Sequence, residues 1–141
     1  MLDITSANAT VGMSVGGLFS INLENFSADS SFTSDTIQVA ETRMGVDGHM
    51  AAGFTPNIKT LTINLEAGSP STEFMILLNQ AQETTRKPYE VNMVVSIPSI
   101  GKRYTFSNGV LQSYKGLPDG NKVLGPTQWV FHFEDMSVEG L

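Results

Sequence analysis

The sequence contains no cysteine and few charged residues, and each shortage excludes a class of protein. Without cysteine, the 141-residue chain cannot form disulfides, thiolate metal sites or a cysteine nucleophile. Charged residues make up only 16% of the chain, against ~25% in typical domains, so neutral polar residues must cover part of the surface. The apolar runs are far shorter than the ~20 residues of a membrane-spanning helix, and the first ten residues lack the pattern of a secretory signal. We therefore expect no membrane span.

Basic residues are scarce and unevenly placed. Eight basic residues stand against fourteen acidic ones, a net charge of −6, whereas a sequence-reading nucleic-acid binder needs a basic face. Residues 1–58 hold six acidic residues and one basic residue, and residues 59–141 hold eight and seven. Nearly all the net charge therefore lies in the first two-fifths. This asymmetry indicates either an acidic solvated face or two parts that meet different surroundings.

Residues that carry catalytic chemistry are almost absent. The chain has two histidines, and only His49, two residues after Asp47, has a neighbour that could orient an imidazole. There is no nucleophile elbow, no metal-ligand spacing and no phosphate-binding glycine motif. We expect no catalytic residue, no metal and no cofactor, and we expect His132 to be a surface or interface residue.

Alternation of apolar and polar residues predicts strands with one buried face. The apolar positions are Val11, Met13 and Val15; Phe19, Ile21 and Leu23; Leu61, Ile63 and Leu65; Val91, Met93, Val95 and Ile97; and Trp129, Phe131 and Phe133. The segments 104–106 and 110–114 predict two further strands. The dipeptide Asn108-Gly109 between them predicts a hairpin turn, because both central residues of such a turn need positive φ.

One segment has helical periodicity instead. Phe74, Leu77, Leu78 and Ala81 follow the i, i+3, i+4, i+7 spacing of one helical stripe. Ser69 is the expected N-cap with Pro70 at the first helical position, Arg86 and Lys87 lie in the last expected turn, and Pro88 ends the segment. We predict a helix near 70–86. The whole chain, 1–141, is predicted to be a single mainly-β domain: a β-sandwich or partly closed barrel with one flanking helix.

The segment 35–57 does not fit a core strand. Residues 35–43 alternate, but the face made of Thr36, Gln38, Ala40 and Thr42 is small or neutral. The Gly-rich stretch that follows carries three apolar residues expected to be exposed, Met44, Val46 and Met50. Two interpretations stay open: an ordinary hairpin with Asp47-Gly48 as its turn, or a loop that docks on a partner.

The order of these features resembles the tail tube proteins of tailed bacteriophages. The stretches that carry the resemblance are residues 4–11, 39–57, 69–74 and 98–126. The resemblance implies a β-sandwich with a flanking helix, a fold similar to that of the type VI secretion tube protein. It also implies hexameric rings that stack into a tube, with adjacent sheets joined into a lumenal barrel through which DNA passes without specific binding.

The resemblance also implies roles for individual residues. The candidates for the lumen are Thr36, Gln38, Ala40, Thr42, Ser20, Asn22 and Glu24. The candidates for contacts between subunits or rings are Glu41, Arg43, Met44, Val46, Asp47, His49 and Met50. A neutral or acidic bore would not retain a polyanion. The implied partners are further copies of the chain, a tail sheath, an initiator or baseplate protein and a terminator. The implied location is the virion tail, assembled in the host cytoplasm.

Three alternatives remain. The chain could form the tube of a phage-derived bacteriocin or a secretion system, in which no DNA passes. It could be a monomeric ligand-binding β-sandwich, which is disfavoured because most aromatic residues occupy core positions of the predicted strands. It could be a small hydrolase built around His49 and Asp47, which the scarcity of catalytic groups disfavours most.

Overall fold

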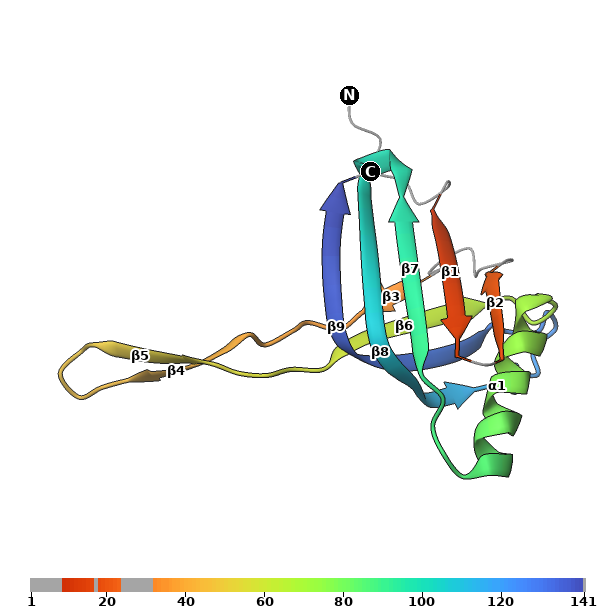
Figure 1. Ribbon diagram of the computed structural model, residues 1–141, viewed down its shortest axis with the longest axis horizontal. Helices are drawn as coiled ribbons and strands as arrows, with labels where there is room; N and C mark the ends of the chain where they lie inside the picture. The colour runs from red at the N-terminus through yellow and green to blue at the C-terminus, as the bar shows by residue number, and fades with distance from the viewer. Residues whose placement is uncertain (1–8, 17, 24–31, 141) are drawn as a thin grey trace.

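A seven-stranded antiparallel sheet forms the body of the molecule (Figure 1). The computed structural model describes residues 9–16, 18–23 and 32–140. The elements are β1 (Thr10–Val15), β2 (Phe19–Asn22), β3 (Phe32–Ser34), β4 (Ala40–Met44), β5 (Met50–Phe54), β6 (Lys59–Leu65), α1 (Ser71–Thr85), β7 (Val91–Ile97), the 3₁₀ turn η1 (Pro98–Ile100), β8 (Lys102–Lys115) and β9 (Thr127–Gly140). The order in the large sheet is β2-β1-β7-β8-β9-β6-β3, and β4 and β5 form a second sheet. The predicted mainly-β fold with a flanking helix is confirmed.

Two long strands, β8 and β9, connect the two halves of the sheet. The first half of β8 pairs with β7, and the first half of β9 pairs with β6. Along almost their whole length the two strands also pair with each other. The sheet bends along these strands, so that its halves face each other across the core (Figure 1). Among the described residues, no helix combines the length and hydropathy needed to cross a bilayer.

The core follows the predicted alternation. Val11, Met13 and Val15 are buried on β1, as are the predicted apolar positions of β6 and β7 apart from Ile97, which is half-buried. The aromatic residues Trp129 and Phe131 are fully buried on β9, and each such side chain contributes about 1.5–3 kcal/mol to folding. The period-2 pattern therefore identified the buried face of each central strand.

The ends of helix α1 lie close to the prediction. The helix begins at Ser71 with Pro70 at the N-cap position, one residue later than predicted. The Ser69 hydroxyl still accepts a hydrogen bond from the backbone N–H of Ser71 at 3.2 Å, as capping side chains do. At the other end Arg86 adopts a left-handed conformation (φ 59°), and its N–H donates to the Gln82 carbonyl at 2.9 Å. Arg86 and Lys87 therefore follow the helix, and their predicted place in its last turn is wrong.

The buried stripe of α1 is rotated from the predicted one. Met75 and Leu78 are fully buried, whereas Leu77, a member of the predicted stripe, is exposed. Phe74 is half-buried and packs its ring against Phe19 of β2, with centroids 5.2 Å apart. The helix lies at the end of the sheet beside β2 (Figure 1).

The predicted hairpin at Asn108-Gly109 is wrong. Residues 102–115 form one continuous strand, β8, and Asn108 takes its positive φ (55°) in a β-bulge opposite β7. The Asn108 N–H donates to the Asn92 side-chain oxygen at 3.2 Å. A chain reversal does not occur here because β9 pairs with β8 on both sides of the bulge.

The need for glycine at this bulge gives a testable prediction. A Cβ at Gly109 would lie 2.2 Å from a ring carbon of Phe133 and 2.7 Å from the His132 carbonyl oxygen. Gly109→Ala should therefore lower the free energy of unfolding by about 1–3 kcal/mol, measured by urea denaturation. Gly120→Ala, where no atom lies within 4 Å, is the matched control. Equal stability of the two variants would contradict the packing described here.

Candidate functional site

A long β-hairpin made of β4 and β5 extends away from the body of the molecule (Figure 1). The two strands pair with each other from Ala40 opposite Phe54 to Met44 opposite Met50. They form a sheet of their own, separate from the seven-stranded sheet. The hairpin joins the body through residues 35–39 and 55–58, which are not strands. Of the predicted strand over residues 35–43, only 40–43 are therefore in a strand.

The hairpin exposes large apolar side chains on a structure too thin to bury them. Every residue from 41 to 54 is exposed. The exposed fraction is 66% for Met44, 63% for Met50 and 81% for Phe54, and Val46 at the turn is fully exposed. A two-stranded ribbon is marginally stable in water on its own, and clustered exposed apolar residues mark interaction sites. This ribbon is therefore the main candidate for a functional surface.

The two faces of the hairpin differ in chemistry. Cross-strand partners share a face, so one face carries six mostly apolar residues: Ala40, Thr42, Met44, Met50, Ala52 and Phe54. We call this the methionine face. The other face carries Glu41 and Arg43 opposite Gly53 and Ala51. In the described part of the chain neither charged residue forms an ion pair, so both charges are available to a partner.

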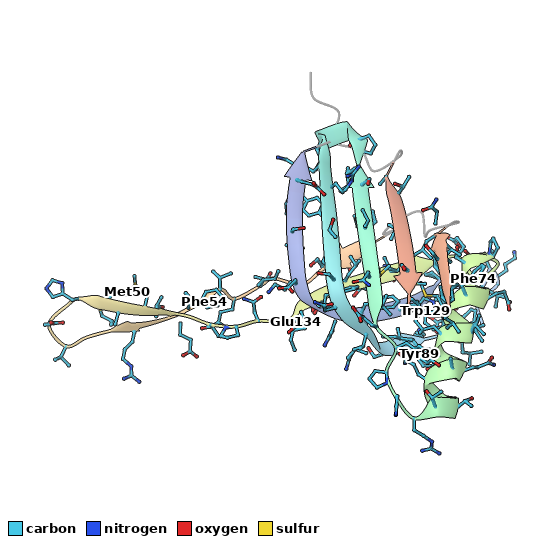
Figure 2. All side chains as sticks on the ribbon, in the orientation of Figure 1. Met50, Phe54, Phe74, Tyr89, Trp129 and Glu134 are labelled. Atoms are coloured by element: carbon cyan, nitrogen blue, oxygen red, sulfur yellow. The ribbon has the colours of Figure 1, made fainter. Side chains whose placement is uncertain are left out.

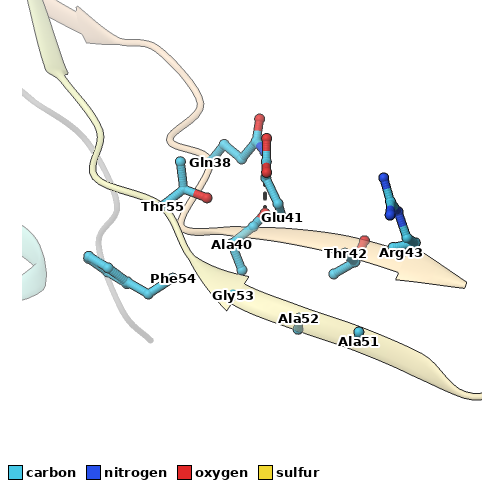
Figure 3. Close-up of a pocket in the computed structure, with 10 residues that line it drawn as sticks. All are labelled: Gln38, Ala40, Glu41, Thr42, Arg43, Ala51, Ala52, Gly53, Phe54 and Thr55. Atoms are coloured by element: carbon cyan, nitrogen blue, oxygen red, sulfur yellow. Dashed lines mark hydrogen bonds between the residues drawn. The ribbon is translucent and has the colours of Figure 1, made fainter.

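A shallow groove of about 670 Å³ runs along the hairpin (Figure 3). Its lining includes the small residues Ala51 and Gly53 and the long side chains of Glu41 and Arg43, which share one face of the ribbon. At its root the Gln38 side-chain amide donates to the Ala40 carbonyl at 3.3 Å. Small residues in the lining allow close approach of another backbone or side chain.

A lysine joins the root of the hairpin to the body. The Lys59 ammonium donates to two backbone carbonyls, those of Asn57 and Glu134, each at 3.3 Å. Asn57 belongs to the connection that follows β5, and Glu134 lies midway along β9. Figure 2 shows Glu134 where the hairpin leaves the sheet. Lys59 therefore helps to set the direction in which the hairpin points.

The turn of the hairpin is ordered by its own hydrogen bonds. The Gly45 N–H donates to the His49 carbonyl at 2.8 Å, and Gly48 has positive φ (86°). The Asp47 carboxylate accepts from the backbone N–H of His49 at 3.0 Å. This carboxylate stabilises the turn through the backbone, which is a structural role and not the orientation of the imidazole. No cluster of three or more potential metal ligands occurs among the described residues.

The residues predicted for the lumen lie in two separate places. Thr36 and Gln38 precede β4, and Ala40 and Thr42 lie on the methionine face. That face therefore contains residues predicted for the lumen together with Met44 and Met50, which were predicted for contacts. Ser20 and Asn22 are exposed on β2, at an edge of the large sheet, and Glu24 lies outside the described residues.

The outer face of the large sheet is polar and weakly charged, with a shallow hollow of about 340 Å³ over β1 and β2. It consists of the residues that alternate with the buried positions of β1, β2, β7, β8 and β9, and most are small or neutral. They include Gly12, Ser14, Ser20, Asn22, Asn92, Val94, Ser96, Thr105, Ser107 and Ser137. Its charged residues include Asp135, Glu139 and Arg103, and Arg103 lies 3.9 Å from the Glu139 carboxylate. We call this surface the polar sheet face.

Ala52, Phe54 and Lys59 belong to this site but were not among the predicted residues. Met50, Ala52 and Phe54 alternate with Ala51 and Gly53, a period-2 pattern that would have predicted β5. The small residues concealed it, because alanine and glycine suggest a loop. Nothing in the sequence pointed to Lys59, whose role depends on a carbonyl 75 residues away.

Comparisons with known proteins place the chain among phage-tail proteins. The sequence of residues 2–137 matches the family described as Tail fiber protein gp32. This match confirms the predicted resemblance to a phage-tail family. No curated protein matches the sequence significantly.

Several solved structures share the fold. A chain of the anti-feeding prophage (AFP) baseplate, 6-fold symmetrised, is 14% identical and has a TM-score of 0.63, with 99% of this chain and 97% of that chain covered. A chain of the PVC sheath/tube terminator in the extended state, from an extracellular contractile injection system, is 13% identical and has a TM-score of 0.64, with 99% of both chains covered. A chain of the PVC sheath-tube complex is 12% identical and has a TM-score of 0.60, with 99% and 94% covered.

The anchoring role of Lys59 is testable. Lys59→Met keeps the aliphatic stem but removes both hydrogen bonds, and it should lower the free energy of unfolding by about 1 kcal/mol. Spin labels are attached at Val46, at the tip of the hairpin, and at Glu83, on α1. In Lys59→Met, pulsed electron paramagnetic resonance should report a broader distribution of the distance between the two labels. The control is Lys122→Met, an exposed lysine in the loop before β9. An unchanged distribution in Lys59→Met would refute the anchoring role.

Proposed function

Because the chain belongs to the Tail fiber protein gp32 family, we propose that it is a structural subunit of a phage tail tube. Copies form hexameric rings, and the rings stack into a hollow tube. The fold shared with chains of a sheath-tube complex and a sheath/tube terminator supports a tube rather than a fibre. The 6-fold symmetry in the description of the AFP baseplate supports six copies per ring.

The hairpin is the observation that carries this proposal. Nothing in the described part of the chain covers its methionine face or the apolar turn residue Val46. Burial against a neighbouring copy would remove these side chains from water at about 25 cal/mol per Å² of apolar area. A contact between two different surfaces of the same chain is head-to-tail, and such contacts build both closed rings and stacked filaments. Glu41 and Arg43 on the other face are then available for contacts with a second neighbour.

The polar sheet face is the best candidate for the wall of the bore. DNA would slide past serine, threonine and asparagine without strong contacts, and the surplus of acidic over basic residues on this face repels phosphate. Ser20 and Asn22, both predicted for the lumen, lie on this face. A second candidate lining consists of four residues on and before the hairpin: Thr36, Gln38, Ala40 and Thr42.

The proposed tube has further consequences. Its partners are a sheath, an initiator or baseplate protein and a terminator, and its place is the virion tail after assembly in the host cytoplasm. The names of the matched family and structures describe parts of tails and injection systems rather than enzymes, and we propose no catalytic activity and no cofactor for this chain.

A second candidate function is the tube of a particle that carries no DNA. The observation in its favour is that the similar structures come from contractile injection systems and the anti-feeding prophage. A bore that does not bind a polyanion suits either kind of particle, so this candidate shares the architecture and differs only in the cargo.

The hairpin contact predicts a loss of assembly on mutation. Met44→Asp combined with Met50→Asp places two charges on the methionine face without touching the core. The loss of two buried methionines, about 3 kcal/mol or more, should weaken self-association about a hundredfold. Sedimentation velocity at a series of concentrations measures this change.

The matched control for this variant is Val123→Asp. Val123 is 82% exposed, but it lies in the loop between β8 and β9 and away from the hairpin. It should assemble like the unmodified chain. Normal assembly of the methionine double variant would rule out the hairpin as the contact.

The wall of the bore can be identified with two sets of lysines. The first variant carries Asn22→Lys, Ser107→Lys and Ser137→Lys on the polar sheet face. The second carries Thr36→Lys, Gln38→Lys and Thr42→Lys. Assembled tubes of the first variant should retain a short duplex DNA at least about tenfold more tightly at low salt, and high salt should release it. Retention by the second variant alone would assign the bore to the hairpin, and retention by neither would contradict both linings.

A further inference from the structure

An apolar pocket of about 320 Å³ opens between the two halves of the large sheet. It is lined mainly by Phe32, Leu61, Val95, Ile97, Tyr104 and Met136. Strand β6 pairs with β9 only as far as Phe133, so beyond this point the halves separate and the core is left open. This volume is at the lower end of the ~300–1,000 Å³ of ligand sites. The pocket therefore suits a few side chains of a protruding loop better than a flat protein surface.

One positive charge lies at the rim of this pocket. Lys102 pairs with Ile97 across β7 and β8, and it is two residues from Tyr104 on the same strand. Both of those residues line the pocket, so Lys102 belongs to the same face of the sheet. It is exposed, and within the described ranges its ammonium has no ion-pair partner. The site thus combines an apolar interior with a lysine at its edge that has no ion-pair partner among the described residues.

The tip of the hairpin has the complementary chemistry. Val46 is fully exposed at the turn, and the pair Met44 and Met50 lies directly behind it. Asp47, beside Val46, supplies one carboxylate. The hydrogen bonds of the turn hold this arrangement in place, and Gly45 leaves room for it, because a Cβ there would lie 2.7 Å from the Asp47 carboxylate. An ordered tip loses little conformational entropy on binding.

We propose that the hairpin tip of one copy inserts into this pocket on a second copy. Val46 is the anchor inside the pocket, the methionines cover its mouth, and Asp47 faces Lys102. The hairpin points away from its own sheet (Figure 1), so the tip cannot fill the pocket of its own molecule. The match of an apolar tip and a carboxylate with an apolar pocket and a cation at its rim selects a second copy as the occupant. This inference rests on the proposed self-assembly and names the surface that receives the hairpin.

Because the chain contains no cysteine, only introduced cysteines can form disulfides in a cross-linking test. A size-tagged Val46→Cys chain is mixed and co-assembled with an untagged Ile97→Cys chain, and the assemblies are oxidised with diamide. A disulfide-linked heterodimer should form in high yield and disappear on reduction. Val46→Cys mixed with Val123→Cys is the matched control, and it should give no heterodimer above the background of unassembled chains.

The outcomes separate this inference from the proposed function. Normal assemblies without the 46–97 heterodimer, or with equal cross-linking to residue 123, would overturn the docking of the tip and leave the tube in place. Failure of the unmodified chain to assemble would overturn both proposals. Protection of Ile97→Cys from a thiol reagent in isolated, monomeric chains would show another occupant of the pocket and would also overturn the docking.

Charge removal tests the contact at the rim. Asp47→Asn keeps an acceptor for the His49 N–H; it and Lys102→Gln should each weaken self-association several-fold in sedimentation at low salt, and the double variant should weaken it no further than either single variant. Lys122→Gln is the control for the change in net charge and should have little effect. Additive losses in the double variant would contradict a contact between Asp47 and Lys102.

Discussion

A β-ribbon of two strands cannot bury its own side chains, and the proposed self-assembly of this molecule follows from that constraint. The hairpin of β4 and β5 satisfies its inner backbone hydrogen bonds, but both faces and both outer edges are exposed. Solvent would leave such a ribbon marginally stable, yet it carries methionine, valine and phenylalanine where a solvated loop would carry polar residues. Its sequence is explained if the surface that stabilises it belongs to another molecule.

The body of the chain has the opposite character. Trp129 and Phe131 are fully buried in its core, and its large outer surface is made of small polar residues with few charges. The two parts therefore have different roles in the proposed tube. The hairpin makes the contacts between copies, and the polar sheet face forms a wall to which cargo does not adhere. Lys59 connects them, because its two hydrogen bonds fix the hairpin at the bend of β9.

The sequence predicted the parts of the fold that local patterns control. Alternation identified the buried face of the central strands, and the Ser69 cap and Pro88 bounded the helix closely. The errors came where distant contacts decide. Asn108-Gly109 has the chemistry of a turn, but pairing with β9 on both sides makes it a bulge. The helix buries Met75 with Leu78 and exposes Leu77, which its own periodicity did not predict. In the site, the exposure of Met44, Val46 and Met50 was predictable from the sequence. That Thr42 and Met44 share a face with Met50 depends on the register of β4 and β5. The role of Lys59 depends on a carbonyl of β9 that is distant in the sequence.

The most direct test of the central claim is a cryo-electron microscopy reconstruction of the assembled protein, resolved well enough to trace the hairpin. We expect six-fold rings in which residues 40–54 of each copy lie against a neighbouring copy and the methionine face of the hairpin is buried. Rings or tubes in which that hairpin points into solvent, with Met44 and Met50 uncovered, would contradict it.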